Sequence, residues 1–516
     1  MDAGYFHLAI LHFFFFLLLI CSVWSDAGIS PSNKDEEMAE TDGGSWQGIS
    51  KATAEKLHIL YGGIGPVIIP EAFAGQKDSS ASKGGQSVVK RSAESSNIEE
   101  ELSNKPEQIH LAYGETPSEM VVMWSTGLAG LTEVRYGLLE NNLNMSMTGE
   151  HVIFTERNSE GVKFVHRVKL ANLLPGTQYY YLVKTNDQES EILHFTTMKD
   201  GTDWSPTIIM FGDMGTRGGS PSLRILNKAA LSQSVDAIIH TGDFAYDLHE
   251  EGGKVGDDFM NRIQYAASRL PYMTCVGNHE IAWDTFSHYR YRFSMPGVEW
   301  PTPVDRLFYS FDMGPVHFIS YSTEVHFARE GRDIAKQVAW LQEDLQEANT
   351  NRNNRPWVIA FGHRPMYCSN NDRDDCTKED SKVRQGFEKL FYDEGVDIIV
   401  EAHEHSYERF WPMYGGEVTQ RNYTNPRAPV HIIGGAAGCN EFDKVCINPI
   451  FGPKGPWSAF RSWFPGLYGV GKLFVVNATH LHWQQLLALN EQTLDHFWIH
   501  QEHHGPFPHR TEESTM

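Results

Sequence analysis

Residues 207–215 of this chain read TIIMFGDMG, an apolar run that ends in the turn-like sequence Gly-Asp-Met-Gly. A short apolar run bounded by turn residues is typical of a strand buried inside a domain. Six further apolar runs follow, separated by helical stretches, at residues 237–240, 273–276, 316–321, 357–361, 398–400 and 430–433. This alternation predicts an α/β domain, which we place at residues 201–516.

Five of the seven predicted strands end within a few residues of an acidic, amide or imidazole side chain. In chain order these residues are Asp213, Asp243 with Tyr246, Asn278 with His279, His363, and His403 with His405. Each alone suits an ordinary turn, because Asp and Asn stabilise turns. Turn stabilisation does not explain why such side chains follow five of the seven predicted strands. In α/β sheets, ligands bind at the carboxyl ends of strands. We therefore expect the five loops to meet in one site.

The segment before this domain has a different pattern. Short alternating stretches at residues 120–124, 164–170, 179–184 and 192–196 predict antiparallel strands. The run LLPGTQYYY at residues 173–181 looks like the turn and tyrosine corner of a fibronectin type III-like sandwich. We assign residues 105–200 to an all-β domain with a structural or recognition role, since no polar cluster in it suggests chemistry.

The composition is that of a globular protein, with 41% hydrophobic and 12% aromatic residues, and it excludes wholesale disorder. A formal net charge of -23 would repel a phosphate backbone, so nucleic acid is not an expected partner. The 24 histidines against 6 cysteines favour metal sites made of imidazoles over sites made of thiolates.

The first 25 residues predict a secretory signal peptide, because an apolar run densest from Phe13 to Cys21 precedes a suitable cleavage position before Asp26. An uncleaved anchor is the alternative, since no Lys or Arg precedes the run. Residues 26–104 are expected to be a flexible leader, because their second half is polar and lacks aromatic residues. No later segment is long and apolar enough to span a bilayer. We expect a secreted or lysosomal protein.

Two further expectations depend on that route. The sequence contains N-glycosylation sequons at Asn144, Asn422 and Asn477. In an oxidising compartment the short spacings predict two local disulfides, Cys368 with Cys376 and Cys439 with Cys446. Cys275 lies in an apolar run and is expected to be a buried, unreactive thiol.

The series of strand-end motifs resembles that of the purple acid phosphatases, particularly the long animal and plant forms. The motifs are GDMG at 212–215, GDFAY at 242–246, GNHE at 277–280, GH at 362–363 and AHEHSYER at 402–409. The likeness covers about residues 105–507. It implies a metallophosphoesterase domain of the α+β sandwich type that follows the fibronectin type III-like domain.

Carried over by position, the resemblance implies a binuclear metal centre. Its ligands would be Asp213, Tyr246 and His405 for a ferric ion, Asn278, His363 and His403 for a divalent ion, and Asp243 as the bridge. Phenolate and carboxylate donors suit Fe(III), whereas imidazole and amide donors suit Zn(II), Fe(II) or Mn(II). Tyr246 is the discriminating residue, because Gly215 stands where other binuclear metallophosphoesterases usually carry a histidine.

The resemblance gives His279 a role in contacting phosphate or in protonating the leaving alkoxide, and the alternative is a histidine that only orients its loop. Plant members carry further histidines nine or ten residues past the motif that holds His363. This sequence has Asp372 and Arg373 there, so the second proton donor stays unassigned. Arg373 is either a phosphate clamp or part of a solvated loop.

The expected activity is therefore hydrolysis of phosphate monoesters at acidic pH, with small phosphorylated molecules as substrates. A ferric ion lowers the pKa of bound water further than a divalent ion does, which suits catalysis in acid. Two alternatives stay open: a phosphodiesterase or nucleotide pyrophosphatase that uses the same metals, and a catalytically silent secreted binding protein. The physiological substrate, the divalent metal and the oligomeric state are not predicted.

Overall fold

The computed structural model describes residues 104–155, 162–371, 373–439, 453–462 and 467–507. The predicted signal peptide, nearly all of the predicted leader, Asp372 and Cys446 lie outside these residues. Among the described helices, none has the length and apolar character that crossing a bilayer requires.

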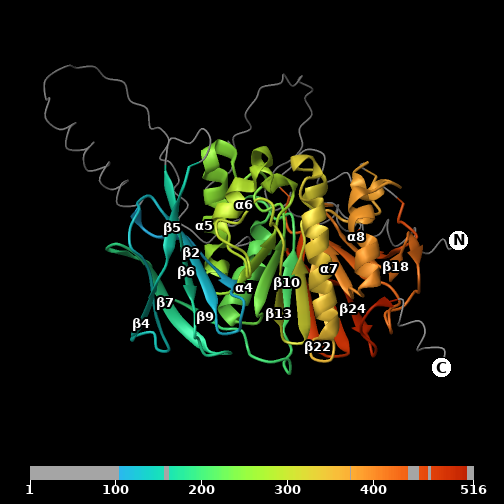
Figure 1. The fold of residues 1–516 in the computed structure, drawn as a ribbon, viewed down its shortest axis with the longest axis horizontal. Coiled ribbons are helices and arrows are strands. Elements are labelled where there is room, and N and C mark those ends of the chain that lie inside the picture. The colour runs from blue at the N-terminus through green and yellow to red at the C-terminus, as the bar shows by residue number, and fades with distance from the viewer. Residues whose placement is uncertain (1–103, 156–161, 372, 440–452, 463–466, 508–516) are drawn as a thin grey trace, which may run out of the picture. The chain divides into compact units, whose positions relative to one another are not determined.

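The N-terminal part of the described chain is a sandwich of two antiparallel sheets (Figure 1). One sheet has the order β1 (Glu107–Tyr113), β2 (Met120–Thr126), β6 (Lys163–Leu170) and β5 (Glu150–Phe154). The other has the order β4 (Met145–Thr148), β3 (Thr132–Gly137), β7 (Gln178–Thr185) and β8 (Gln188–Glu189), with β9 (Leu193–Thr196) also paired to β7. The expected all-β domain is confirmed.

Buried aromatic side chains from both sheets form part of the core of this sandwich. Trp124 of β2 and Tyr181 of β7 are fully buried, and the Trp124 indole donates to the Thr185 hydroxyl at 2.8 Å. The hydroxyl of Tyr179 accepts from the backbone amide of Leu174 at 3.0 Å, which fixes the turn before β7. That bond is the tyrosine-corner contact that the run of three tyrosines suggests.

All seven strands predicted for the second domain are present, but they are divided between two sheets. The first sheet has the order β12 (Tyr272–Cys275), β11 (Ala237–Thr241), β10 (Thr207–Phe211), β22 (Gly469–Asn477), β23 (His480–Leu487) and β24 (Thr493–His500). The second has the order β13 (Tyr309–Met313), β14 (Val316–Ser320), β15 (Trp357–Phe361), β16 (Ile398–Glu401), β20 (Val430–Gly434), β17 (Tyr407–Phe410) and β21 (Ser458–Arg461). A two-strand ribbon joins β18 (Met413–Tyr414) to β19 (Glu417–Val418).

Each sheet contains a parallel series of strands, which antiparallel strands extend. β10 pairs in parallel with β11 and β11 with β12, while β14, β15, β16 and β20 form one parallel series. β22 joins β10 in the antiparallel direction. Parallel strands place their carboxyl ends at the same edge of a sheet, so each sheet brings several strand ends together.

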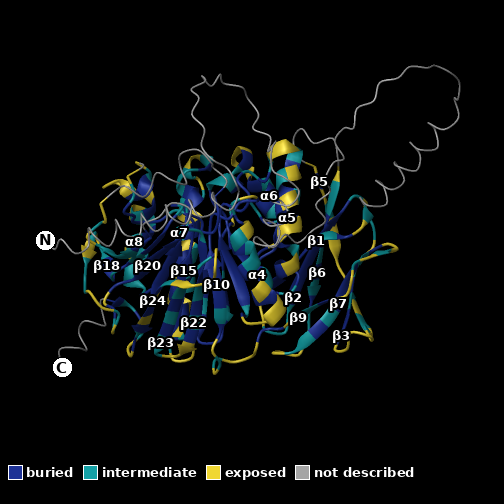
Figure 2. Cartoon of the chain, turned by 180° about the vertical axis from the view of Figure 1, so that it is seen from behind, coloured by how far each residue is buried: buried dark blue, intermediate teal, exposed yellow. Residues whose placement is uncertain are grey.

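The helices cover the sheets from outside. They are α4 (Ser220–Ser232), α5 (Lys254–Ala267), α6 (Ser287–Arg292), α7 (Ile334–Thr350) and α8 (Lys382–Asp393). Buried residues of α7 and α8 pack with Val358, Ala360 and Ile399, whereas the alternate residues Ile359 and Val400 belong to the core shared with the first sheet. Each parallel strand is thus buried on both faces, as its continuous apolar sequence requires. Figure 2 shows, from the opposite side, strands in the colour of buried residues beside helices α4 and α5, which carry exposed residues.

Short helical turns complete the connections. They are η1 (Glu250–Gly253), η2 (Asn278–Glu280), η3 (Ala282–Phe286), η4 (Thr323–His326), η5 (Arg329–Gly331) and η6 (Asp375–Thr377). Two of these turns, η2 and η6, lie in loops that carry predicted site residues.

The sandwich is joined to the second domain through buried polar contacts. The guanidinium of Arg292, whose side chain is 2% exposed, donates to Gln108 of β1 at 2.9 Å and to Asp257 of α5 at 2.8 Å. Asp257 also pairs with Lys163 of β6. The Tyr181 hydroxyl donates to the carbonyl of Ser268 at 2.6 Å.

Candidate metal centre

All seven predicted metal ligands lie on loops that follow parallel strands of the two sheets. In chain order they are Asp213 after β10, Asp243 and Tyr246 after β11, Asn278 after β12, His363 after β15, and His403 and His405 after β16. The amide of Asp213 donates to the carbonyl of Gly242 at 3.2 Å, and Asp213 Oδ2 accepts from the amide of His403 at 2.9 Å. These bonds join the strand ends of both sheets, so the five loops meet as the sequence predicts.

Asp213, Tyr246 and His405 form the first group of donor atoms. The Tyr246 hydroxyl lies 2.8 Å from His405 Nε2, which in turn lies 3.4 Å from Asp213 Oδ1. Asp213 is fully buried, and its Oδ1 has no hydrogen-bond partner among the described residues. A buried carboxylate oxygen beside a phenol and an imidazole is a donor set that a cation would satisfy.

The second group contains Asp243, Asn278, His363 and His403. His363 Nε2 lies 3.2 Å from Asp243 Oδ2, 3.1 Å from Asn278 Oδ1 and 3.2 Å from His403 Nδ1. One ring nitrogen cannot satisfy three such neighbours by hydrogen bonding alone. Asp243, His363 and His403 each offer a ligand atom within 4.8 Å of the other two.

The tautomer of neutral His363 is fixed by its other nitrogen. Nδ1 lies 2.8 Å from the carbonyl oxygen of Thr241, and only an N–H can donate to that oxygen. The Nε2 lone pair of the neutral ring therefore faces Asp243, Asn278 and His403. Metal-binding histidines are commonly oriented in this way, so the residues present fit a divalent ion.

Charge interactions within the second group are strong. Burial by itself would raise the pKa of Asp243, but His363 and His279 hold that pKa well below its usual range. Burial by itself would lower the pKa of His363, but the Asp243 carboxylate raises it to about 10. The Asp243 carboxylate is thus held ionised beside His363.

A buried glutamate holds the loops that present Asp243 and Asn278. The Glu280 carboxylate accepts from the backbone amides of Asp243 at 2.8 Å, Phe244 at 3.0 Å and Gly277 at 2.8 Å. Burial and the Asp243 charge raise the pKa of Glu280 to about 7. The sequence shows Glu280 only as the last letter of GNHE. Its contacts with Asp243 and Phe244 arise only on folding, so no local sequence signal marks it.

Several predicted ligands have a strained backbone. Asp213, Asp243, Tyr246 and His403 have φ angles of 58°, 52°, 59° and 66°. Non-glycine residues adopt this left-handed region rarely, and such residues cluster at functional sites. Gly242 has φ of 85°, and a Cβ there would lie 2.6 Å from His363 Nδ1 and 2.7 Å from the Gly277 amide nitrogen. Glycine is therefore required between β11 and Asp243.

His279 lies at the edge of the second group. Its Nε2 is 3.9 Å from Asp243 Oδ2, and its Nδ1 is 3.2 Å from Asp247 Oδ1. Asp247 is partly exposed and has φ of 72°, so the chain turns sharply to place it there. Asp247 was not predicted from the sequence, because only the fold brings it beside His279.

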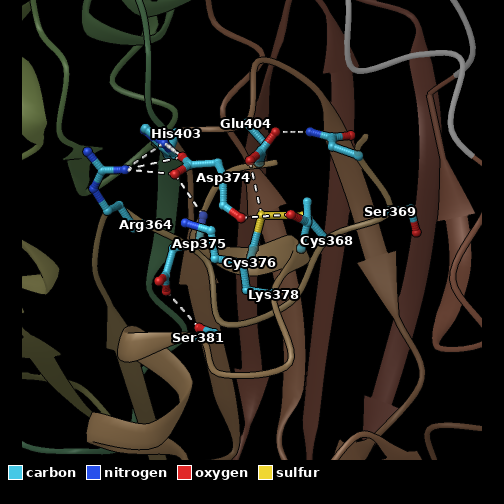
Figure 3. The surroundings of a disulfide bond; sticks show 12 residues. Arg364, Cys368, Ser369, Asp374, Asp375, Cys376, Lys378, Ser381, His403 and Glu404 are labelled. Carbon is cyan, nitrogen blue, oxygen red and sulfur yellow. Dashed lines mark hydrogen bonds and ion pairs between the residues drawn. A yellow bond between two sulfur atoms is a disulfide. The ribbon is translucent and has the colours of Figure 1, made fainter. Parts of the chain in front are cut away.

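The loop after His363 approaches the centre through Asp374, and Asp372 lies outside the described residues. Arg373 is exposed, while Asp374 contacts His403 Nε2 and lies 3.2 Å from Arg364 Nη1 (Figure 3). Burial by itself would raise the pKa of Asp374, but His403 and Arg364 lower it. Cys368 and Cys376 form the expected disulfide at the base of this loop.

Cys275 and Cys439 lie in different surroundings. Cys275 is a free, fully buried thiol whose pKa is raised by burial. Cys439 Sγ lies 3.0 Å from His405 Nδ1, next to the first donor group. Its expected partner Cys446 is outside the described residues, so that pairing stays a prediction.

Three family models match the chain in the order that the fold shows. They are described as Purple acid Phosphatase, N-terminal domain, at residues 106–197, Calcineurin-like phosphoesterase at 206–407, and Iron/zinc purple acid phosphatase-like protein C at 428–496. The chain is 44% identical over 413 residues to Acid phosphatase type 7 of Homo sapiens, a match that covers 77% of this chain and 91% of that protein. The chain belongs to the purple acid phosphatase family.

The chain is also similar to other proteins of this family, in sequence and in fold. Acid phosphatase type 7 of Danio rerio is 43% identical over 427 residues, covering 78% of this chain and 93% of that protein. The solved structure of purple acid phosphatase PPD1 from yellow lupin matches with a TM-score of 0.62 at 22% identity, covering 78% of this chain and 75% of that one. The lupin structure confirms the fold, an all-β domain followed by a metallophosphoesterase domain. Membership of the family implies a binuclear metal centre.

Proposed function

We propose that this protein is an acid phosphatase that hydrolyses phosphate monoesters at a centre of one Fe(III) and one divalent ion. The observation that carries the proposal is the convergence of two donor groups at the strand ends, with the tautomer of His363 already set by the Thr241 carbonyl. The phenol of Tyr246 in the first group supports Fe(III) there, and the imidazoles and amide of the second support Zn(II), Fe(II) or Mn(II).

The metal ions and the side chains around them would have separate roles in the reaction. The ions would supply Lewis acidity and activate water for attack on phosphorus. Asp243 lies within reach of the second group and on the loop that carries Tyr246, which supports its bridging role. His279 faces the same space with Nε2 while Asp247 contacts its Nδ1, an arrangement suited to donating a proton to the leaving group.

Metal counting and a phosphate-release assay across monoesters and diesters at several pH values test the proposal. We expect iron and one divalent ion per chain, with monoester hydrolysis fastest in acid. Faster turnover of diesters or of nucleotide pyrophosphate bonds would favour the phosphodiesterase alternative. A protein that binds no metal and releases no phosphate would be the silent binding protein.

The visible spectrum tests the iron ligand separately. In this family a tyrosinate bound to Fe(III) absorbs visible light, so the wild-type protein should be purple or pink and Tyr246→Phe should lose that band. Iron should be counted in both proteins. A colourless wild type with full iron occupancy would remove Tyr246 as a ligand.

We also propose that the chain passes through the secretory pathway to a lysosomal or extracellular destination. The side chains of Asn144, Asn422 and Asn477 are exposed, which supports glycosylation at these sequons. The Cys368–Cys376 disulfide supports an oxidising compartment. Glycosidase treatment of the protein from its native cells, followed by peptide mapping, tests the three sites. Migration unchanged by the enzyme would contradict glycosylation.

A further inference from the structure

The two ring nitrogens of His403 face different surroundings. Nδ1 lies 3.2 Å from His363 Nε2 and points into the second donor group. Nε2 points the other way, where it contacts the Asp374 carboxylate and lies 3.0 Å from Arg364 Nη1 (Figure 3). Only Nδ1 of His403 is therefore placed to ligate the divalent ion of the proposed function.

This orientation decides where the proton of neutral His403 must be. A ligating Nδ1 needs a free lone pair, which leaves the proton on Nε2. A protonated Nε2 cannot accept from Arg364, but it can donate to the carboxylate of Asp374. Asp374 is thus the acceptor that selects the ligating tautomer.

Arg364 holds Asp374 in place. Its guanidinium lies between Asp374, at 3.2 Å from Nη1, and the fully buried Glu324, at 3.0 Å from Nε. The guanidinium also stacks on the ring of Phe327, 4.5 Å from its centroid. A planar cation with two carboxylate partners and an aromatic face has little freedom to move.

The loop itself is fixed on both sides of Asp374. Cys376 is tied to Cys368 by the disulfide, with the two Cα atoms 5.5 Å apart. Asp375 is buried and accepts from the Ser381 hydroxyl at 2.7 Å and from the amide of Lys382 at 3.1 Å, so it anchors the loop to the start of α8. Asp374 also accepts from the amide of Asp375 at 2.7 Å, which caps η6.

We propose that Asp374 is a positioning residue that holds His403 in its metal-ligating tautomer and orientation, and that the disulfide loop 368–376 is the frame that presents it. The inference rests on the proposed function, because it assigns Asp374 to the divalent half of that centre. Loss of a carboxylate that supports a metal-binding histidine typically weakens metal affinity by about 10- to 100-fold. Asp374 should act on retention of the divalent ion and leave the iron side, with His405, unchanged.

Three substitutions in the full-length protein separate positioning from loop structure. Asp374→Ser keeps an oxygen that can cap η6 but is too short to reach His403. Asp374→Asn keeps the shape but removes the charge and leaves one acceptor oxygen in place of the two that cap η6 and face His403. Asp380→Ser, at an exposed aspartate between η6 and α8, is the matched control. The measurements are Zn²⁺ affinity by competition with a chromogenic chelator, iron content per chain, and thermal unfolding.

We expect Asp374→Ser to weaken Zn²⁺ binding by about 10- to 100-fold, Asp374→Asn to weaken it less, and the control to match wild type. Iron content should stay at the wild-type value in all three. If Asp374→Ser does not fold, the isosteric Asp374→Asn decides, with several-fold weaker binding expected. Wild-type Zn²⁺ affinity in a folded Asp374→Ser, or in Asp374→Asn where that variant decides, would overturn the inference.

The outcome for the proposed function is read from the wild-type protein alone. Suppose that the wild type binds iron and Zn²⁺ and releases phosphate, and that the Asp374 variants bind Zn²⁺ with wild-type affinity. That result would refute only the role of Asp374. A wild type that binds no Zn²⁺ and releases no phosphate would refute the proposed function, and the inference would fall with it.

Discussion

His279 is the residue best placed to act on the leaving group, since its Nε2 faces Asp243 and its Nδ1 contacts Asp247 at 3.2 Å. If it donates a proton, its loss should affect poor leaving groups most. We expect His279→Ala to slow hydrolysis of alkyl phosphates by about 10²- to 10⁴-fold and to slow aryl phosphates with acidic phenols much less. The measurement is kcat/KM on both substrate types. Equal losses with both metals retained would assign His279 to phosphate binding or loop orientation.

Asp243 and His363 differ in what their loss should do to the metals. Asp243 is the proposed bridge, whereas the predicted ligands that His363 contacts among the described residues are Asp243, Asn278 and His403 of the second group. We expect Asp243→Asn to lower occupancy of both ions and His363→Ala to empty mainly the divalent site. Metal counting on the purified variants checks this contrast. The bridging assignment is wrong if each variant loses one ion only.

At the residue scale the sequence predicted the side chains that follow strands and missed those that support them. Asp213, Asp243 and His403 each stand directly after an apolar run, a position that local sequence reveals. Asp374 and Glu280 act through contacts between segments far apart in the chain, such as Asp374 with His403. Such contacts exist only after folding, so turn chemistry and spacing alone could not have found them.

At the scale of elements, a histidine clamps the edge of the second sheet to helix α7. His317 of β14 lies 2.8 Å from Asp312 of β13 through Nδ1 and 3.0 Å from Asp344 of α7 through Nε2. Burial by itself would lower the pKa of His317, but the two aspartates raise it to about 9. The protonated ring is therefore stabilised in the folded protein.

The sign of the resulting pH dependence follows from that raised pKa. The clamp contributes fully below the unfolded pKa of about 6.5 and is lost as pH rises through 9. We expect His317→Gln to lower the free energy of unfolding by on the order of 2–3 kcal/mol at pH 6 and by much less at pH 10. Urea denaturation at both pH values, with the exposed His503→Gln as control, measures this. If the free energies of unfolding of wild type and His317→Gln differ by the same amount at both pH values, His317 does not act as this clamp.

The strands were the most predictable elements. The runs at 207–211 and 357–361 agree with β10 and β15 at both ends, because a strand buried on both faces is apolar throughout. The division of the strands between two sheets was not predicted. The local sequence of a parallel strand does not indicate which other strand it pairs with. The antiparallel β22, which extends the first sheet, comes from a distant part of the chain.

At the scale of the molecule, Arg292 joins the sandwich to the catalytic domain through Gln108 and Asp257. Removing it leaves the Asp257 carboxylate without one of its two cations. We expect Arg292→Ala to lower the free energy of unfolding by roughly 1.5–3 kcal/mol, the scale of a hydrogen bond to a charged group, because Lys163 still pairs with the partly exposed Asp257. Guanidinium denaturation should be compared with that of the exposed Arg306→Ala. Equal stability of the two variants would show that the interface does not depend on this pair.

The left-handed backbone at Asp213, Asp243, Tyr246 and His403 has a consequence for protein engineering. Glycine would relieve strain on the order of 1–3 kcal/mol at each position, so a selection for heat resistance alone would reward it wherever the removed side chain contributes less than that to stability. Each such gain would delete a proposed metal ligand. Directed evolution of this enzyme therefore needs a catalytic screen in every round, because the most readily stabilised descendants would be inert ones.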